Sequence, residues 1–366
     1  MTLTRDGGAD MRYREPPSGA GEAVADALHG ARTSDVAAGR TTRPPAAPPT
    51  ERILAALPGS RPLLIVVWGL VPWLNLAAVA LLAPSWPGGI PWGEVLNRTA
   101  TSFAVVLSLW GVSRITEELR RLQVRLTDSV EEARPDVEHL FRGLDSVTAP
   151  LVLLAATGVV LPLDEMVRAE PGAALIQGVT WVVIGIPLCT AFWVYVALQL
   201  GLIRLGRGHV TLRDYDGDRT LGLQPVGRLA FTGFWLILGS VGPVVLTGLS
   251  DLPVTLVGAG VLVAAVALFF LSLSDLHRQM VAVKERERAQ ATELYRQAYR
   301  DLRGAPTLDV LQQHAGLLGA AESLERRAER IQEWPFDEGT FARVVTIASS
   351  AGATILARLL LAPTGL

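Results

Sequence analysis

The chain has 366 residues, of which half are hydrophobic and only 19% are charged, and its mean hydropathy is +0.34. Soluble globular domains carry about 25% charged residues, so a single water-soluble core does not account for this composition. The net charge of −2, with arginines scattered among acidic residues, gives no basic surface of the kind that binds nucleic acid. We therefore expect a membrane protein with no nucleic-acid partner.

The N-terminal residues 1–58 are polar and rich in Gly, Ala and Pro, and they include the run RPPAAPP from Arg43 to Pro49. They contain too few large apolar side chains to offset the loss of chain entropy on folding. We expect a disordered cytoplasmic tail. The first apolar run begins only near Pro62, too far along the chain for a cleaved secretory signal, so that run should stay as an anchor.

Long apolar runs predict the membrane part of the chain, residues 59–275. A helix of roughly 20 residues crosses about 30 Å of hydrocarbon, and several runs approach or exceed that length. The fold class we expect is all-α, a polytopic membrane bundle of six to seven spans. The fourth run exceeds the bilayer thickness and must tilt or extend beyond it. The candidate spans are residues 62–83, 99–115, 147–163, 173–203, 229–249 and 253–274, with a seventh in 335–366 at 344–362.

Arginine is unevenly distributed among the loops, and short arginine-rich loops stay in the cytoplasm. The loops at 114–146 and 204–228 carry six and five arginines, whereas the intervening loops carry only Arg98 and only Arg168. We therefore place both arginine-rich loops and the N-terminus in the cytoplasm of a cell-membrane protein. Trp86 and Trp92 in the first outer loop fit an aromatic belt at the interface.

Residues 276–334 predict two charged helices after the sixth span. Gly304 and Pro306 interrupt the helical pattern, so the two helices should fold back as a cytoplasmic antiparallel hairpin of coiled-coil type. Apolar residues recur on the second helix at spacings of three and four, which predicts its buried face. This face consists of Leu311, Ala315, Leu318, Ala321, Leu324, Ala328 and Ile331.

Two smaller cytoplasmic elements are also predicted. Residues 117–142 have a helical pattern around Pro135, and residues 209–223 read as a β-hairpin with a tight Asp-Gly turn. The carboxylates of DYDGD resemble the start of a calcium loop, but Arg219 and Pro225 stand where that loop needs Gly and Glu. We therefore favour a turn over a calcium site at Asp214, Asp216 and Asp218.

The sequence contains no recognisable catalytic or ligand-binding motif. We therefore expect no catalytic, cofactor-binding or metal-binding residues and no cofactor. None of the histidines has the spacing of a metal site, and no nucleotide-binding or nucleophile motif occurs. The single cysteine, Cys189, lies in an apolar run and reads as a small buried residue. The histidines are His29, His139, His209, His277 and His314.

The first six predicted spans contain no ionisable residue near the bilayer midplane, where such a group marks coupled transport. Uncharged amides there favour hydrogen bonds between helices, and the amides are Asn75, Gln177 and Gln199. Prolines inside spans are read as kinks, although a broken helix can also expose carbonyls to an ion or substrate. These prolines are Pro72, Pro187 and Pro243.

The segment EWPFD, residues 333–337, stands where the hairpin returns to the membrane. Pro335 ends one helix, while Trp334 and Phe336 suit the headgroup region. With LQPVGRLA before a span and EWPFD before a last apolar segment, the chain from Pro62 onward resembles uncharacterised multi-spanning membrane proteins of bacteria and archaea. The resemblance implies a topology, and it implies no activity and no catalytic residue.

The predicted seventh span contains Arg358, whose charge opposes insertion unless it snorkels to the far interface. A polar residue recurs at every fourth position of this segment, which also suits an amphipathic helix on the inner interface. We favour the span.

Large charged segments combined with spans that lack chemistry indicate a non-enzymatic membrane protein. Our hypothesis is that it sits in the lipid bilayer and binds a cytoplasmic protein partner through residues 276–334, or relays a state. Pairing of hairpins from two copies would give a homo-oligomer. The alternative is a channel or facilitator-type transporter without carboxylate coupling, and an intramembrane enzyme ranks third.

Overall fold

The structure is a computed structural model. It describes residues 47–82, 90–129, 141, 143–160, 171–208, 219–247, 252–303, 308–336 and the short pieces 339, 342–346, 349–350 and 352–353. Within these residues every regular element is helical, as the composition predicts. The helices are α2 (Pro49–Ala56), α3 (Arg61–Gly69), α4 (Val71–Leu82), α5 (Trp92–Ser129), α7 (Thr148–Val160), α9 (Pro171–Arg207), α10 (Gln224–Thr247), α11 (Leu252–Leu302) and α12 (Leu308–Arg330).

Five described helices are long and apolar enough to cross a membrane, which makes the chain a helical membrane protein. They cover Arg61–Leu81, Trp92–Leu122, Ala174–Arg207, Gln224–Val245 and the apolar part of Val257–Arg300.

The counts of six and seven spans stay predictions. The expected third span corresponds to α7, whose described 13 residues are shorter than a crossing, and residues 161–170 lie outside the described part. Most of the expected seventh span, including Arg358, also lies outside it.

The prolines within the spans have two different effects. α9 continues through Pro187 and α10 through Pro243, so neither helix is broken there. The first span is interrupted at Leu70, between α3 and α4, because Pro72 has no N–H to continue the hydrogen-bond ladder.

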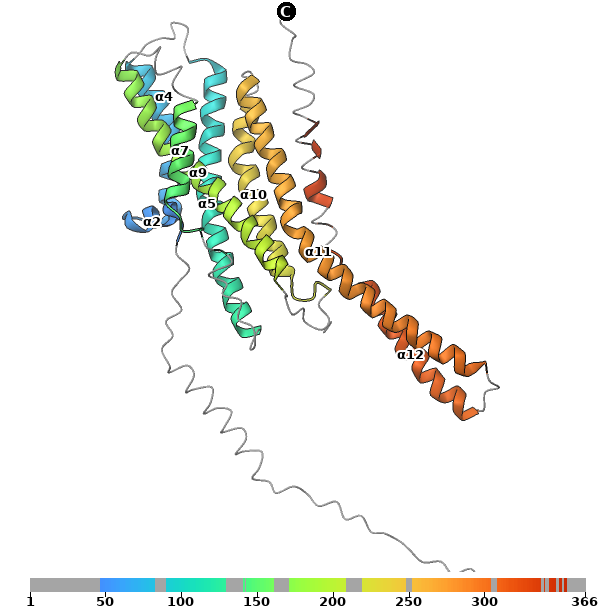
Figure 1. Cartoon of the computed structure of the whole chain (residues 1–366). Helices are drawn as coiled ribbons and strands as arrows, with labels where there is room; N and C mark the ends of the chain where they lie inside the picture. The colour runs from blue at the N-terminus through green and yellow to red at the C-terminus, as the bar shows by residue number, and fades with distance from the viewer. Residues whose placement is uncertain are drawn as a thin grey trace, which may run out of the picture. The chain divides into compact units, whose positions relative to one another are not determined.

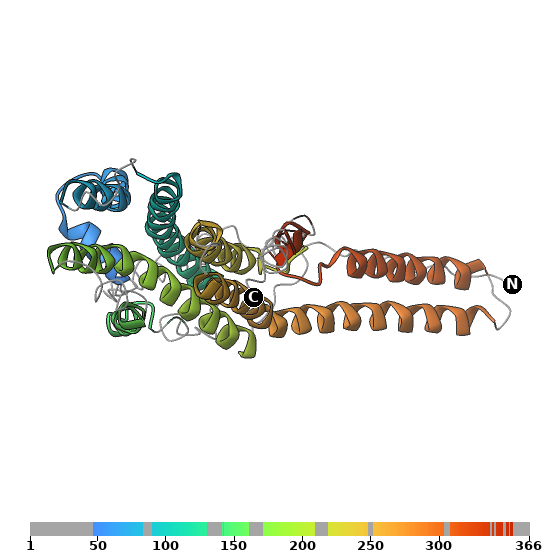
Figure 2. The same cartoon turned by 90° about the horizontal axis from the view of Figure 1, so that it is seen from above.

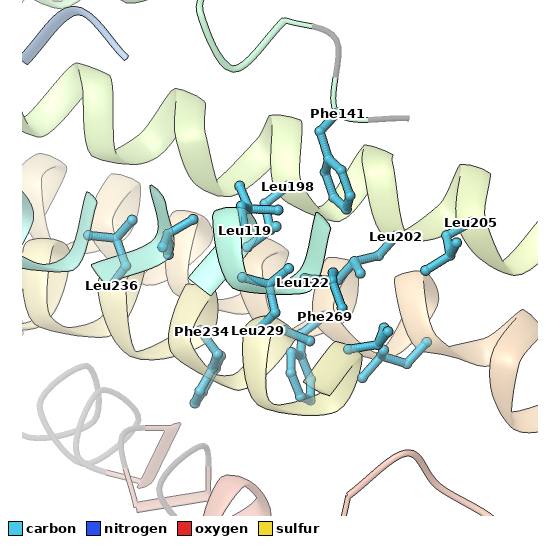
Figure 3. Packing of buried hydrophobic residues seen from close by; sticks show 14 of the residues in the cluster. Leu119, Leu122, Phe141, Leu198, Leu202, Leu205, Leu229, Phe234, Leu236 and Phe269 are labelled. Atoms are coloured by element: carbon cyan, nitrogen blue, oxygen red, sulfur yellow. The ribbon is translucent and has the colours of Figure 1, made fainter. Parts of the chain in front are cut away.

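α9 lies at the centre of the bundle and contacts α2, α4, α5, α7, α10 and α11 (Figures 1 and 2). The largest hydrophobic cluster forms where α5, α9, α10 and α11 meet. Figure 3 shows the labelled members of this cluster between the helices, among them Leu122, Leu202, Leu229 and Phe269. Packing of this cluster holds the four helices together.

The most extensive helix contact, between α5 and α10, depends on glycine. A Cβ on Gly111 would overlap Leu236, and a Cβ on Gly239 would lie 3.2 Å from Leu107. Each glycine thus accommodates a leucine of the other helix. Next to these contacts the buried hydroxyls of Ser108 and Ser240 are 2.7 Å apart. Small residues allow helices to approach closely in a membrane, where apolar burial alone does not favour association.

α11 is one uninterrupted helix of 51 residues, or roughly 76 Å at the usual rise per residue. This length is more than twice the hydrocarbon thickness, so its charged second half extends beyond the membrane. α12 returns alongside that half (Figures 1 and 2). The two helices meet through alanines at seven-residue spacing, all at most 2% exposed, namely Ala291 and Ala298 on α11 and Ala321 and Ala328 on α12.

The predicted buried face of α12 is correct in part. Ala321, Ala328 and Ile331 are buried, and Leu318 and Leu324 are half-buried. Ala315 is exposed, so its assignment was wrong, and the buried residue of that turn is His314. The reason is that the buried positions 314, 321 and 328 repeat every seven residues, and a pattern of threes and fours does not distinguish position 314 from position 315. The side chain of Leu311 lies outside the described residues.

The predicted disordered tail was wrong for residues 49–56, which form α2. Glu51 is buried there, accepts a hydrogen bond from Ser113 at 2.6 Å and pairs with Arg61, while Leu54 joins a core cluster. A paired carboxylate and one buried leucine stabilise a short helix that the composition alone does not predict. Residues 1–46 lie outside the described part.

The predicted cytoplasmic elements between the spans have mixed outcomes. α5 extends to Ser129, and the rest of the predicted helix, apart from isolated turn residues, lies outside the described residues. Residues 219–222 form turns, so the second arm of the predicted β-hairpin was wrong there, because Leu221 and Gly222 have positive φ angles of 53° and 85°. Residues 209–218 are not described.

Ala321→Leu should separate α12 from α11, because its methyl is fully buried between the helices. Overpacking of this kind costs about 1–3 kcal/mol. Hydrogen exchange of α12 amides in the full chain should accelerate accordingly, whereas Ala320→Leu, at an exposed neighbouring position, should leave it unchanged. Equal exchange in the two variants would contradict the alanine contact.

Candidate functional site

Residues 331–336, here called the return segment, leave α12 and pack onto the bundle. The N–H of Gln332 donates a hydrogen bond to the carbonyl oxygen of Arg219 at 3.0 Å. A Cβ on Gly227, in the first turn of α10, would overlap the carbonyl oxygen of Pro335. The backbone of the return segment therefore lies directly on α10, and only glycine permits this contact.

This contact joins the two short motifs of the sequence. Gly227 belongs to LQPVGRLA and Pro335 belongs to EWPFD. The motifs are far apart along the chain, and each was interpreted separately from its position before an apolar segment. The structure shows that they are two sides of one contact. We call the region formed by the return segment with α9, α10 and α11 the junction.

Aromatic rings of the return segment pack against α11 at the junction. Trp334 is stacked on His277 of α11, with ring centroids 4.3 Å apart and planes 18° apart, and it also stacks on Phe336 at 5.7 Å. Phe336 in turn lies 6.2 Å from Phe269 of α11. Phe336 is 5% exposed and belongs to the main core cluster. The return segment thus inserts this ring between helices, and its predicted location at the level of the headgroups stays a prediction.

Polar contacts fix the same segment to α11. His277 Nδ1 lies 2.7 Å from the carbonyl oxygen of Glu333, and because a carbonyl only accepts, Nδ1 carries the proton and donates. The ammonium of Lys284, the only lysine of the chain, donates to Glu333 Oε1 at 3.0 Å. This hydrogen bond, followed by the positive charge of Lys284, lowers the pKa of Glu333.

α11 is held at the same level from the side of α9. Gln279 Nε2 donates to the carbonyl oxygen of Gly206 at 2.6 Å, and a Cβ on Gly206 would lie 3.1 Å from Asp275 Cβ. Asp275 pairs with Arg207 at 3.8 Å and with Arg278 at 3.6 Å. Both arginines are more than 70% exposed, so these pairs contribute little stability themselves.

The turn that receives the return segment is conformationally unusual. Leu221 has φ of 53° and its side chain is 3% exposed. A leucine in this region is strained by about 1–3 kcal/mol, which the burial of its side chain offsets. The turn presents the Arg219 carbonyl to Gln332 and leads directly into α10.

The other candidate residues of the sequence lie elsewhere. Asn75 donates to Thr180 at 2.8 Å, and Gln199 accepts from Ser272 at 2.5 Å, so both amides bond between helices as favoured. Cys189 is buried on α9. Within the described residues, no group of three His, Cys, Asp or Glu side chains is placed to hold a metal ion. His29, His139, His209, Asp214, Asp216 and Asp218 lie outside those residues.

Sequence reasoning did not connect His277 with EWPFD. His277 was considered only as a metal ligand, and the aromatic character of the return segment was the signal that could have indicated a stacking partner. No pattern in the sequence indicates the role of Gly227, because glycine is common in membrane helices and its contact partner is a backbone segment far along the chain.

Comparisons with known proteins give no identification: no family model matches the chain, and no curated protein or solved structure is similar to it.

Acidification should loosen the return segment through Glu333. Because its pKa is lowered when the segment is docked, ionised Glu333 stabilises docking above its ordinary value of 4.5, and this contribution is lost as pH falls through the lowered value. The pair is half-exposed, so the effect should be only about a few tenths of a kcal/mol. Hydrogen exchange of residues 331–336 in wild type and Glu333→Gln should converge in acid.

The matched controls are on α11. Lys284→Met should reduce the difference in exchange between wild type and Glu333→Gln, because Lys284 is the largest cause of the lowered pKa of Glu333. Arg286→Met, at an exposed position of the same helix, should preserve the difference. A difference that is undiminished in Lys284→Met would show that the lysine is not its main cause.

Proposed function

We propose that this protein is a non-enzymatic membrane protein that relays a state between its membrane bundle and the α11–α12 pair. The observation that carries the proposal is that α11 runs without a break from the bundle to the far end of this pair, while the return segment attaches the end of α12 to α10. The pair is thus connected to the bundle at two points, one covalently continuous and one docked.

Two connections make the position of the α11–α12 pair dependent on the packing of the bundle. A shift of α10 relative to α11 moves the two attachment points relative to each other, because Gly227 contacts Pro335 while His277 and Phe269 hold the rings. Packed helices respond to such shifts by moving between discrete arrangements. The α11–α12 pair would then turn a small change in the bundle into a larger displacement at its far end.

A charged surface suits the pair for contact with a soluble protein partner. Most of its outward side chains are exposed and ionisable, and several form ion pairs within the pair, such as Arg327 with Glu287 and Arg326 with Glu322. Together with the arginine distribution of the loops, this supports a cytoplasmic location for the pair and for the N-terminus in a cell membrane.

A channel or facilitator is the alternative function. It would require polar groups that face a water-filled path, yet the described buried hydroxyls and amides at Ser108, Asn75 and Ser272 bond across helix contacts. These bonds favour a packed bundle. Substrate-dependent flux in vesicles containing the purified protein would support the alternative instead.

Gly227→Leu tests the relay. It should displace the return segment and broaden the distance distribution between spin labels at Arg120→Cys on α5 and Ala320→Cys on α12, both at exposed positions, in a Cys189→Ala background. The measurement is pulsed electron spin resonance on the full chain in lipid nanodiscs. Wild type should give one narrow distribution.

Gly316→Leu is the matched control, because a Cβ at that position on α12 meets no atom within 4 Å. It should leave the distances unchanged. The relay is refuted if Gly227→Leu exposes residues 331–336 to hydrogen exchange and yet leaves the spin-label distances as they are in wild type.

A further inference from the structure

Two exposed tryptophans lie on the side of the α5–α10 contact that faces away from α9. Trp110 on α5 is 56% exposed and Trp235 on α10 is 43% exposed. Each lies two residues from a residue that faces the core, Val112 on α5 and Gly233 on α10. Two residues turn a helix through more than half a circle, so both indole rings point outward from the bundle.

Arginines continue the same two rows toward the end of the bundle from which α11 extends (Figure 1). On α5, Arg114 and Arg121 follow Trp110 at successive spacings of four and seven residues, and both are exposed. On α10, Arg228 precedes Trp235 by seven residues and is also exposed. Such spacings keep residues on one helix face. The exposed side chains thus change from aromatic to cationic, as they do where a protein surface passes from hydrocarbon to headgroups.

A polar bridge between the helices holds the two rows together. Thr232 of α10 donates to Glu118 Oε2 of α5 at 2.9 Å, and Glu118 Oε1 lies 3.3 Å from Nε of Arg114. The Thr232 hydroxyl also lies 3.0 Å from the carbonyl oxygen of Arg228, one turn away. Arg114 and Arg228 are therefore on the same side of the α5–α10 contact. The surface, here called the α5–α10 face, consists of Trp110, Arg114, Glu117, Arg121, Arg228, Thr232 and Trp235.

Cations outnumber anions at the α5–α10 face. Glu118, beneath it, is only 13% exposed and is satisfied by the bridge, and Glu117 pairs with Arg121 at 3.0 Å. Arg228 has no carboxylate partner among the described residues. Arg114 and Arg121 both pair through Nε, whereas the terminal nitrogens of a guanidinium carry most of its N–H donors. The face therefore offers a net positive charge and guanidinium N–H groups to an anion.

Other arginines at this end of the bundle already have partners. Arg61 pairs with the buried Glu51, and Arg52 donates to two backbone carbonyl oxygens. Arg207 pairs with Asp275 of α11. The α5–α10 face differs because its arginines adjoin exposed indole rings and one of them has no carboxylate. A ligand that matches this surface is anionic at one end and apolar at the other.

We propose that the α5–α10 face binds an anionic phospholipid, with the phosphate at the arginines and the acyl chains along Trp110 and Trp235. A guanidinium matches the geometry of phosphate oxygens and binds them by charge-assisted hydrogen bonds. Both tryptophans belong to helices that are apolar enough to cross the membrane, so acyl chains are the natural cover for them. A soluble anion would contact only the arginines. This proposal goes beyond the relay and stands without it.

Quenching of tryptophan fluorescence by brominated lipid tests the proposal on the full chain in phosphatidylcholine vesicles. In one series, added phosphatidylglycerol carries bromine on its acyl chains, and in the other the same fraction of phosphatidylcholine carries it. The chain has nine tryptophans, so the signal of the face is the part of the quenching that is lost in Trp110→Phe/Trp235→Phe. This part should reach half of its maximum at a lower fraction of phosphatidylglycerol than of phosphatidylcholine.

Arg228→Gln should raise the fraction of phosphatidylglycerol needed for half-maximal quenching about fivefold, the contribution of one basic residue near anionic lipid. This change breaks no ion pair among the described residues, so the bundle should stay folded. Arg120→Gln is the matched control. Arg120 is exposed and lies nine residues after Gly111, which faces α10, so it points away from α10. Its loss should leave the fraction unchanged.

Arg114→Gln/Glu118→Gln distinguishes a site from diffuse attraction, because it removes a guanidinium and leaves the net charge unchanged. Glutamine at position 118 keeps an acceptor for Thr232. The half-maximal fraction should rise in this variant as well. An unchanged fraction here, equal quenching by the two brominated lipids in wild type, or equal effects of Arg120→Gln and Arg228→Gln would overturn the proposal. Displacement of the lipid by inorganic phosphate beyond that by chloride at equal ionic strength would assign the arginines to a soluble anion and also overturn it.

Discussion

The approach of the Pro335 backbone to Gly227 is the constraint on which the arrangement of the junction depends. Without a side chain at position 227, the carbonyl of Pro335 reaches the surface of α10, and Phe336 can then enter the core cluster beside Phe269. Trp334 is placed over His277 by the same approach. Any larger residue at 227 would push the return segment outward and remove all of these contacts together.

Because α11 is continuous, the contacts at the junction affect the position of the whole α11–α12 pair. A helix end that was free beyond the membrane would let the α11–α12 pair move independently of the bundle. Instead, Gln279 binds the end of α9 and Lys284 binds Glu333, at the level where α11 leaves the bundle. The heptad spacing that brings Ala291 and Ala298 against α12 also includes Lys284, so the same helix face that packs the pair delivers the lysine to the return segment.

Much of the helical architecture follows from the sequence because it depends on local pattern. Apolar length predicts α9 and the membrane part of α11, and the breaks at Gly304 and Pro306 coincide with the end of α11 and the start of α12. Contacts between distant backbones are not local. Taken separately, Gly227 indicates only a residue within a helix and Pro335 only the end of one, so neither predicts their contact. Similarly, α2 is stabilised by an ion pair between Glu51 and Arg61, which composition does not reveal.

The junction is also the part of the described bundle most suited to change. The contacts of α5 with α10 are buried, and separating them would expose interdigitated leucines and the paired hydroxyls of Ser108 and Ser240. The return segment is attached by one backbone hydrogen bond to the turn, a hydrogen bond from His277 to the Glu333 carbonyl, a half-exposed ion pair and a stack of rings. Opening of this segment exposes Phe336 and Trp334, whereas separating the helices of the bundle exposes many more apolar side chains, so the segment should open first.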